Sequence, residues 1–258
     1  MPVLTRLSIA PVKSLALHHP QEVALQHDGV RNDRLFYLAD PQGRLVTGSA
    51  VGPLVRVSCA YDIERERLRL DFPDGTSVEG GATDLDEQLT TDFYGRDVPA
   101  HIVDGPFAAA LSDYARRPVR LARVDRAGDG ADVHHLTLVS SESVAELGRQ
   151  AGREGDPDAR RFRMLLEITG VTAHDEDTWD EREVAVGGAV IRIHGQVPRC
   201  VVTTQDPSTG LKDLDTLKTI ARYREPIHDE DGRGLPFGVY GEVVTPATVR
   251  LGDQVVPH

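Results

Sequence analysis

The chain has 258 residues, of which 40% are hydrophobic and 27% charged, a composition typical of a globular protein with a substantial core. Its formal net charge is -12, so the molecule as a whole repels nucleic acid and anionic membranes, and an anionic ligand needs a locally basic pocket. No apolar run approaches the ~20 residues that span a bilayer, and the N-terminus lacks a secretion signal. We therefore expect a cytoplasmic protein that binds neither nucleic acid nor membrane.

Short strand-like runs separated by turn residues fill the first hundred residues and predict a β-meander. Two helices are expected near its end. Residues 82–95 contain Leu89 and Phe93 four residues apart, after Thr83 as a candidate N-cap, which predicts a short helix. Residues 106–117 form the second predicted helix, bounded by prolines.

Strand-like runs return in the second half of the chain. They are interrupted by a helix predicted over residues 141–152, where Ser143 and Glu146 fit a capping box, and by another over residues 213–225. Many short strands with few short helices predict a mainly β fold built of two β-barrel-like halves.

The segment between the two β-rich halves, residues 105–118, is the expected domain connection. The resulting domains comprise residues 1–104 and 105–258. Alternatively the halves share a sheet, with strands of the first half completing the barrel of the second.

Only two cysteines are present, Cys59 and Cys200, which predicts reduced thiols and excludes an iron–sulfur cluster held by four cysteines. Cys59 is predicted to be a core residue. Cys200 follows Arg199 in "RCVVTT", which is predicted to be a buried strand. An adjacent guanidinium stabilises the thiolate that reacts or binds metal, so Cys200 is the best candidate for chemistry. A small buried core thiol is the competing interpretation, and local composition favours it.

A set of basic residues is the second candidate site. The alternation in "RFRMLLEI" predicts a strand that points Arg161 and Arg163 to one face, where an anion could bind. Ordinary salt bridges to the plentiful carboxylates are an equally good explanation. The other members of the set are Lys13 with Ser14, and Arg31 with Arg34.

Histidine pairs and acidic runs are weaker signals. The pairs His18-His19 and His134-His135 are unsuited to chelating one metal, because adjacent side chains of a strand point to opposite faces, but one histidine of each pair could line a site. The acidic runs at 176–181 and 228–232 are expected to be solvated loops, with calcium binding as an alternative, although both lack EF-hand spacing.

Several segments in combination carry a family resemblance: "PVKSL", "NDRLF", "RFRMLLEITG", "HDEDTWDE" and "RCVVTTQDPSTG". Together they resemble the MOSC family, named for the C-terminal domain of molybdenum-cofactor sulfurases. The resemblance covers essentially the whole chain, with residues 1–104 similar to the MOSC N-terminal β-barrel domain and the remainder similar to the MOSC domain. The layout is also similar to that of the mitochondrial amidoxime-reducing component and its bacterial relatives.

The resemblance implies that the chain binds molybdenum cofactor (molybdopterin), with Cys200 supplying a thiolate ligand to the metal. It also implies that basic side chains contact the pterin and its phosphate, which suits guanidinium recognition of a dianion in an otherwise acidic protein. The implied cofactor-binding residues are Lys13, Ser14, Arg34, His134, Arg163 and Arg199.

Two positions depart from the family pattern. The reductase relatives follow the second arginine of "RFR" with Pro-Asn, whereas Met164 and Leu165 stand here. Relatives carry small hydroxyl residues where this chain has Val133 and His134, so His134 either replaces a hydroxyl contact or blocks the site.

The leading functional hypothesis is therefore a molybdenum-cofactor-dependent oxidoreductase that reduces N-hydroxylated or N-oxygenated small molecules. The two cysteines cannot hold a redox cluster, so an external electron-transfer reductase is an expected partner. A second hypothesis makes Cys200 a persulfide carrier or transferase in cofactor sulfuration. A third is a non-catalytic module that binds the cofactor.

Overall fold

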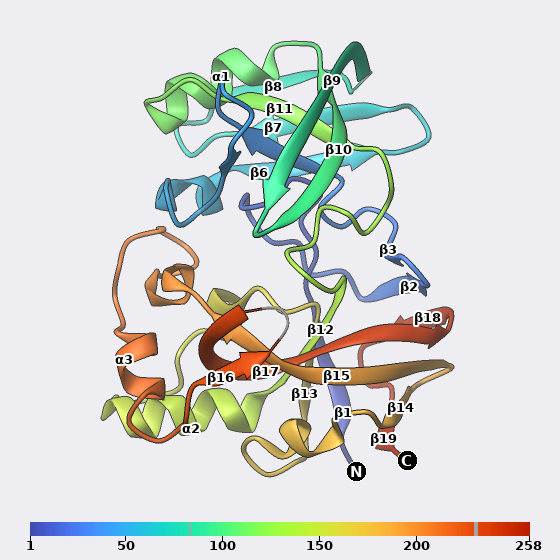
Figure 1. The fold of residues 1–258 in the computed structure, drawn as a ribbon, viewed down its shortest axis with the longest axis vertical. Helices are drawn as coiled ribbons and strands as arrows, with labels where there is room; N and C mark the ends of the chain where they lie inside the picture. Colours follow the sequence, from blue (N-terminus) through green and yellow to red (C-terminus); the bar gives the residue numbers. More distant parts are fainter. Residues whose placement is uncertain (83, 230–231) are drawn as a thin grey trace.

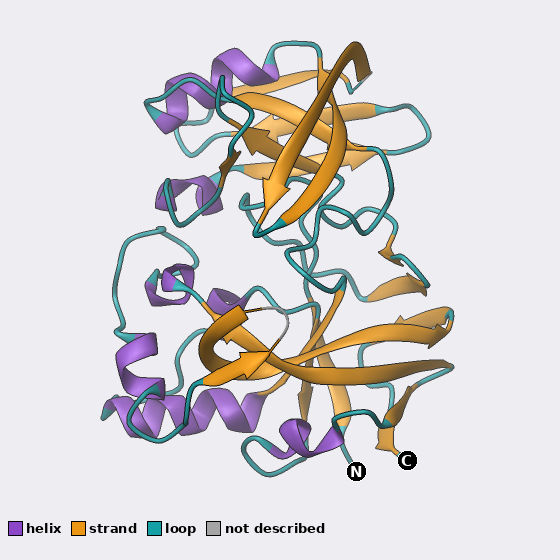
Figure 2. Ribbon diagram, in the orientation of Figure 1, coloured by secondary structure: helices purple, strands orange, loops and turns teal. Residues whose placement is uncertain are grey.

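The computed structural model describes residues 1–82, 84–229 and 232–258, which form two lobes composed mainly of strands (Figures 1 and 2). Helices lie at the outer edges of both lobes, and the two termini lie together at the end of the lower lobe. The mainly β fold class predicted from the sequence is confirmed.

The larger sheet belongs to the lower lobe, which is built mostly from the second half of the chain. Its described strands follow the order β1-β13-β12-β17-β15-β14-β19, and β16 pairs with β17. The sheet nearly closes into a barrel, because Leu4 N donates to Asp253 O and Val255 N donates to Pro2 O, both at 2.9 Å. The strands are β1 (Val3–Leu7), β12 (Leu136–Ser140), β13 (Leu166–Thr169), β14 (Glu183–Val186), β15 (Ala189–Arg199), β16 (Ile227–Asp229), β17 (Gly232–Thr245) and β19 (Val255–Pro257).

The upper lobe contains two smaller described sheets, with the orders β5-β4-β11-β10-β9 and β6-β7-β8. They enclose a separate core that includes Phe36, Leu70 and Phe107. The strands are β4 (Phe36–Ala39), β5 (Leu45–Val46), β6 (Ser58–Asp62), β7 (Arg67–Asp71), β8 (Ser77–Gly81), β9 (Asp84–Phe93), β10 (Arg96–Val103) and β11 (Arg120–Val124).

Strands from the first part of the chain pair with strands from the second part. The strand β1 pairs with β13, and β2 (Glu22–Gln26) lies between β3 (Gly29–Val30) and β18 (Ala247–Arg250). First-half strands therefore complete the sheets of the second half, which was the alternative arrangement expected from the sequence. The domain boundary at residue 104 stays a prediction.

Three α-helices lie in the described ranges: α1 (Phe107–Ala115), α2 (Ser141–Ala151) and α3 (Thr216–Ile220). All three fall inside predicted helical segments, although α3 is much shorter than expected. The predicted capping box of α2 is wrong, because Ser140 is the N-cap and its hydroxyl accepts a hydrogen bond from Ser143 N at 3.1 Å.

The helix predicted over residues 82–95 is wrong, since the segment forms β9 and turns into β10. Thr91 and Phe93 are buried while Asp92 between them is exposed, and Phe93 packs edge-on against Tyr37 at 5.0 Å. Buried residues two positions apart are typical of a strand, whereas Leu89 and Phe93, four positions apart, also fit a helix. Pairing with β10 favours the strand. The predicted N-cap, Thr83, lies outside the described residues.

The predicted strand "RFRMLLEI" is also partly wrong. Residues Ala159–Phe162 form the 3₁₀ helix η2, Arg163 follows in a left-handed conformation, and β13 begins only at Leu166. Alternation along a strand therefore does not apply to Arg161 and Arg163, whose side chains take different directions.

The acidic run at 176–181 is not a wholly solvated loop. Glu176 is fully buried and accepts hydrogen bonds from Ser140 and Ser143, including one of 2.7 Å from the Ser143 hydroxyl. Glu176 therefore anchors the N-terminal turn of α2 through Ser140 and Ser143. In the second acidic run, Glu230 and Asp231 lie outside the described residues.

Candidate functional site

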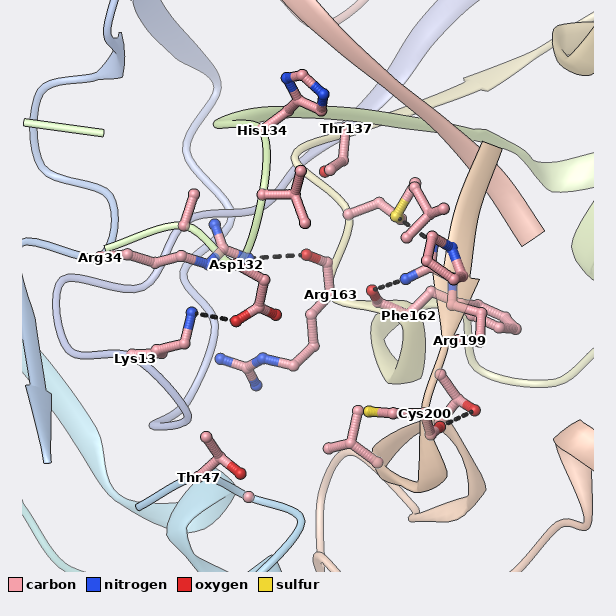
Figure 3. A pocket seen from close by; sticks show the side chains of 18 of the residues that line it. Lys13, Arg34, Thr47, Asp132, His134, Thr137, Phe162, Arg163, Arg199 and Cys200 are labelled. Atoms are coloured by element: carbon pink, nitrogen blue, oxygen red, sulfur yellow. Dashed lines mark hydrogen bonds and ion pairs between the residues drawn. The ribbon is translucent and has the colours of Figure 1, made fainter. Parts of the chain in front are cut away.

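A cavity of about 300 Å³ lies where the two lobes meet, and its close-up view shows basic side chains on one side and a thiol on the other (Figure 3). The size is suited to a small ligand or cofactor. All seven predicted site residues line it: Lys13, Ser14, Arg34, His134, Arg163, Arg199 and Cys200.

Lys13 lies in the segment between β1 and β2 and is almost completely buried. Its Nζ donates to Gly130 O at 2.7 Å, pairs with the Asp132 carboxylate at 2.7 Å, and lies 5.1 Å from the centre of the Phe93 ring. Burial lowers the pKa of the ammonium, an effect that Asp132 opposes. Lys13 is therefore a rigidly held cation inside the pocket.

Arg34 and Arg163 lie beside Lys13 (Figure 3). Arg34 pairs with Asp33 and donates to Arg163 O at 2.9 Å, while Arg163 donates to Leu15 O at 2.8 Å. Burial, together with the nearby charge of Arg34, lowers the pKa of Arg163 to about 10. Two guanidinium groups thus converge on one end of the cavity, which we call the cationic end, with Lys13 as its third member.

Arg199 ends β15 and belongs to the other side of the pocket. Its guanidinium donates to Phe237 O at 2.8 Å, to Phe162 O at 3.1 Å and to Met164 Sδ at 2.6 Å. It lies 5.3 Å from the centre of the Phe162 ring, and burial lowers its pKa to about 10. These bonds hold a positive charge directly before Cys200.

Cys200 is exposed and is the N-cap of the 3₁₀ helix η4 (Val201–Thr204), so the strand predicted here is wrong, and so is the competing interpretation of Cys200 as a buried core thiol. Its Sγ lies 3.9 Å from the Ser49 hydroxyl, which comes from the other lobe. The chain leaves β15 at this point, and the turn presents the thiol to the pocket (Figure 3). Cys59 is buried as predicted, and burial raises its pKa to about 12.

His134 lies at the edge of the pocket, pointing away from the cationic end (Figure 3). Its ring stacks on His194 with 5.8 Å between the centroids and lies 5.1 Å from the ring of Tyr240. The side chain therefore packs against the barrel wall and leaves the cavity open. Leu165, the other departure from the family pattern, is fully buried in the barrel core, whereas Met164 lines the pocket.

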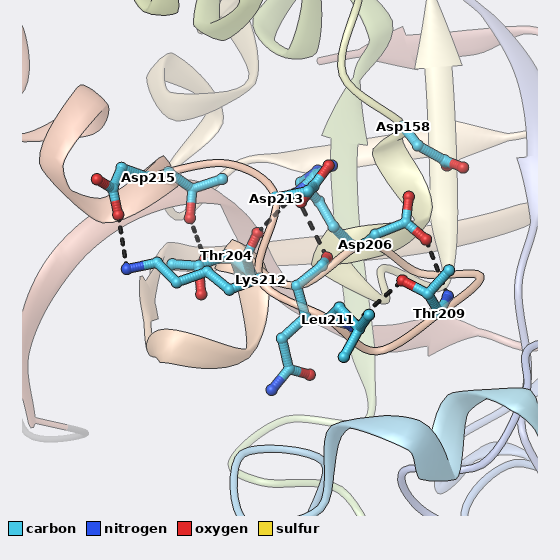
Figure 4. A network of polar contacts seen from close by, with 12 residues as sticks. Asp158, Thr204, Asp206, Thr209, Leu211, Lys212, Asp213 and Asp215 are labelled. Atoms are coloured by element: carbon cyan, nitrogen blue, oxygen red, sulfur yellow. Dashed lines mark hydrogen bonds and ion pairs between the residues drawn. The ribbon is translucent and has the colours of Figure 1, made fainter.

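Arg161 is not part of the pocket lining. It is buried and bonds both carboxylate oxygens of Asp213, at 3.0 and 3.1 Å, and its guanidinium also donates to Thr203 O at 3.1 Å. Asp213 N in turn donates to Thr204 O at 3.1 Å, within a larger polar network (Figure 4). For Arg161 the salt-bridge explanation is correct, and the network fixes the turn that follows Cys200.

Backbone strain is concentrated at this pocket. Eight non-glycine residues of the described chain have a positive φ, and half of them line the cavity. A left-handed conformation of a residue with a β-carbon is unfavourable, and such strain is characteristic of functional sites. The four residues are Ser14 (φ 73°), Arg34 (54°), Tyr94 (56°) and Arg163 (53°).

Sequence reasoning missed several lining residues, among them Ser49, Tyr94, Asp132 and Thr137. Asp132 is the last residue of the glycine-rich stretch "GDGAD" (residues 128–132), which by itself is a loop of a kind that arises by chance. Nothing in the local sequence around Ser49 or Tyr94 indicates that the upper lobe contacts the pocket.

Charge is not balanced around the cavity. Lys13 and Arg34 have carboxylate partners in Asp132 and Asp33, but neither Arg163 nor Arg199 has one in the described part of the chain. A partly buried cation without a carboxylate partner is costly, so the cavity is electrostatically suited to an anionic ligand.

No group of three or more histidine, cysteine or acidic side chains is arranged to hold a metal ion within the described ranges. A metal ion bound at this pocket through Cys200 would therefore need further ligands that are not side chains of such a group. Among the helices of residues 1–82, 84–229 and 232–258, none combines the length and the apolar character needed to cross a membrane.

Comparison with known proteins identifies two family models along the chain. The MOSC N-terminal beta barrel domain matches residues 1–114, and the MOSC domain matches residues 125–256. Human mitochondrial amidoxime reducing component 2 is 34% identical over 280 residues, covering 98% of this chain and 82% of that protein. Human mitochondrial amidoxime-reducing component 1 is 31% identical with the same coverage. Molybdenum cofactor sulfurase from Oryza sativa subsp. japonica is 25% identical, covering 98% of this chain and 35% of that protein.

Proposed function

Because this chain belongs to the MOSC family, we propose that it binds molybdenum cofactor in the cavity between its lobes and acts as an oxidoreductase. The proposed substrates are small molecules that carry an N-hydroxyl or another N-oxygen group. The amidoxime-reducing relatives support this choice of reaction by their names.

One observation carries the proposal: a cationic end with uncompensated charge shares a cavity with an exposed thiol. Two carboxylates pair with the three cations of the cationic end, and Arg199 adds a cation, unpaired among the described residues, on the other side, so the cavity as a whole has an excess of two positive charges. A dianionic phosphate, such as the one that molybdopterin carries, would balance that excess. The residues present therefore fit the group, with the phosphate at Lys13, Arg34 and Arg163.

Cys200 is the proposed thiolate ligand of the metal. Arg199 holds a positive charge one residue away, fixed by its hydrogen bonds to Phe237 O and Phe162 O. When bound, the cofactor would supply the two-electron chemistry that the polypeptide lacks. The work of the chain's own residues is to bind the phosphate, hold the thiolate and shape a cavity that admits a small substrate.

Electrons must come from outside the described site. The chain has two cysteines, and Cys59 is buried in the core of the upper lobe away from the cavity lining. A cluster held by four cysteines is therefore impossible, and we propose an external electron-transfer reductase as the partner.

The test is metal and pterin analysis of protein produced in a host that makes molybdenum cofactor. We compare the wild type with Cys200→Ser, and use Cys59→Ala as the matched control because it removes the other thiol. The wild type and the control should contain near-stoichiometric molybdenum, and Cys200→Ser should lose the metal. Metal-free wild-type protein would refute the oxidoreductase proposal.

Exposure of the Cys200 thiol supports a second candidate, a persulfide carrier or transferase in cofactor sulfuration, and the match to molybdenum cofactor sulfurase points the same way. Mass spectrometry after incubation with a cysteine desulfurase and cysteine would detect a persulfide, 32 Da heavier, on Cys200. A third candidate, a non-catalytic cofactor-binding module, predicts that Cys200→Ser retains both pterin and metal.

A further inference from the structure

Asp132 is the one acidic residue among the described residues that line the cavity. Its carboxylate pairs with Lys13 Nζ at 2.7 Å and lies between Lys13, Arg34 and Arg163 (Figure 3). It therefore occupies the position at which the cationic end would hold the anionic group of a ligand.

The two members of this ion pair are not equally fixed. The Lys13 side chain is 7% exposed and has two contacts besides Asp132, a hydrogen bond to Gly130 O and the Phe93 ring. The Asp132 side chain is 54% exposed, lies on the loop between β11 and β12, and accepts no second hydrogen bond from the described residues. The carboxylate is therefore held by fewer contacts than the ammonium.

Asp33, the other carboxylate of this cluster, shows the contrast. Its side chain is 7% exposed, one oxygen accepts a 2.7 Å hydrogen bond from Ala10 N, and the other pairs with Arg34. Asp33 is thus a counter-ion built into the fold, whereas Asp132 has a direct ion pair with Lys13 and only longer-range attraction to Arg34 and Arg163.

We propose that Asp132 is an exchangeable internal anion, which a ligand's phosphate must displace, and that it thereby determines which anions the pocket accepts. The proposal rests on the proposed function, which brings a phosphate to this end of the cavity. A free anion replaces little more than the contact that Asp132 already provides, so it binds weakly. A ligand that also contacts the remaining cavity wall overcomes the cost of displacement.

The size of this effect follows from the occupancy of the competing state. If the carboxylate fills the position for about 99% of the time, the apparent affinity of every anion falls about 100-fold. Removing its charge should restore that affinity for a small free anion.

The test measures binding of inorganic phosphate to the full chain, purified without cofactor, by titration calorimetry at pH 8. Asp132→Asn keeps the shape and removes the charge, and Asp132→Ser is a second variant that cannot mimic the carboxylate. Asp129→Asn is the matched control: it lies on the same loop, makes the same charge change and faces Arg96, outside the pocket lining. Both Asp132 variants should bind phosphate ~10- to 100-fold more tightly than the wild type, and the control should match the wild type.

Each other outcome has a distinct meaning. Equal binding in the wild type and both Asp132 variants shows that the carboxylate does not compete, and weaker binding in the variants shows that Asp132 contacts the ligand; either result overturns the inference and leaves the proposed function intact. If no form of the protein binds phosphate, the cationic end is not an anion site, and the proposed function loses its supporting observation.

Discussion

Arg163 allows the proposed function to be tested through two effects of opposite sign. Its guanidinium lies near Arg34 and has no carboxylate partner among the described residues. If the charge is kept for ligand binding, Arg163→Met should make the cofactor-free protein more stable and its phosphate binding weaker. A trade of stability for function is common at binding sites.

The magnitude follows from the pKa of Arg163. A pKa of about 10, against 12.5 for an ordinary arginine, means that the fold disfavours the charged form by about 3 kcal/mol. The lost hydrogen bond to Leu15 O offsets about 1 kcal/mol of this, and solvent screening roughly halves the remainder. Arg163→Met should therefore raise the free energy of unfolding by about 1 kcal/mol. Loss of one charge-assisted contact of about 1.5–3 kcal/mol should weaken phosphate binding about 10- to 100-fold.

The assay combines urea unfolding with phosphate titration of the cofactor-free chain. Arg160→Met is the matched control, because Arg160 precedes Arg163 in the same turn but its charge pairs with Asp158 at 2.5 Å. The control should leave phosphate binding unchanged and should not gain stability. If Arg163→Met destabilises the protein and binds phosphate as the wild type does, Arg163 is a structural residue and the reasoning is wrong.

Two further predictions concern Thr203, which follows Cys200 in the pocket lining, and His174, which is outside it. Thr203→Val removes hydroxyl contacts to Cys200 O at 3.0 Å and to Thr216 Oγ1 at 2.8 Å, whereas Thr204→Val removes only a local bond to Val201 O. Amide hydrogen exchange in residues 201–205 should accelerate in both variants. The free energy of local opening should fall by about 2 kcal/mol in Thr203→Val and by about 1 kcal/mol in Thr204→Val. Equal effects would contradict a positioning role for Thr203. Burial and the nearby guanidinium of Arg224 lower the pKa of His174 to about 4, so the free energy of unfolding should be unaffected above pH 6.5 and fall as the pH drops from 6.5 toward 4. Urea unfolding at pH 7.5 and 5.0 should show a smaller fall for His174→Gln, and an unchanged fall would show that another group titrates.

The fold class could be predicted because most strands alternate apolar and polar residues between clear turn signals. The exceptions have physical reasons. In β9, Phe93 satisfies both the helical and the strand period, and only long-range contacts, the pairing with β10 and the packing against Tyr37 of β4, decide between them. In "RCVVTT", the apolar residues that indicate a strand instead form η4, in which the hydroxyls of Thr203 and Thr204 bond to carbonyls three residues earlier.

The sequence predicted seven residues that line the cavity, but it did not predict their arrangement or the other lining residues. Lys13, Arg34, Arg163 and Cys200 come from segments far apart in the chain, so only the family resemblance placed them together. The residues that the resemblance did not supply, such as Asp132 and Ser49, reach the cavity through long-range contacts that leave no local pattern.

The left-handed residues explain why this arrangement is invisible in the sequence. Glycine or asparagine in a sequence would indicate a left-handed residue. In this pocket the left-handed conformation is adopted instead by Ser14, Arg34, Tyr94 and Arg163, whose side chains line the cavity. At Arg163 the left-handed turn separates its guanidinium from that of Arg161, sending one to the cavity and the other to Asp213. A regular strand would have placed both on one face. The left-handed conformation of Arg163 thus separates two arginines that are close in sequence, with Arg163 lining the cavity and Arg161 in a salt bridge.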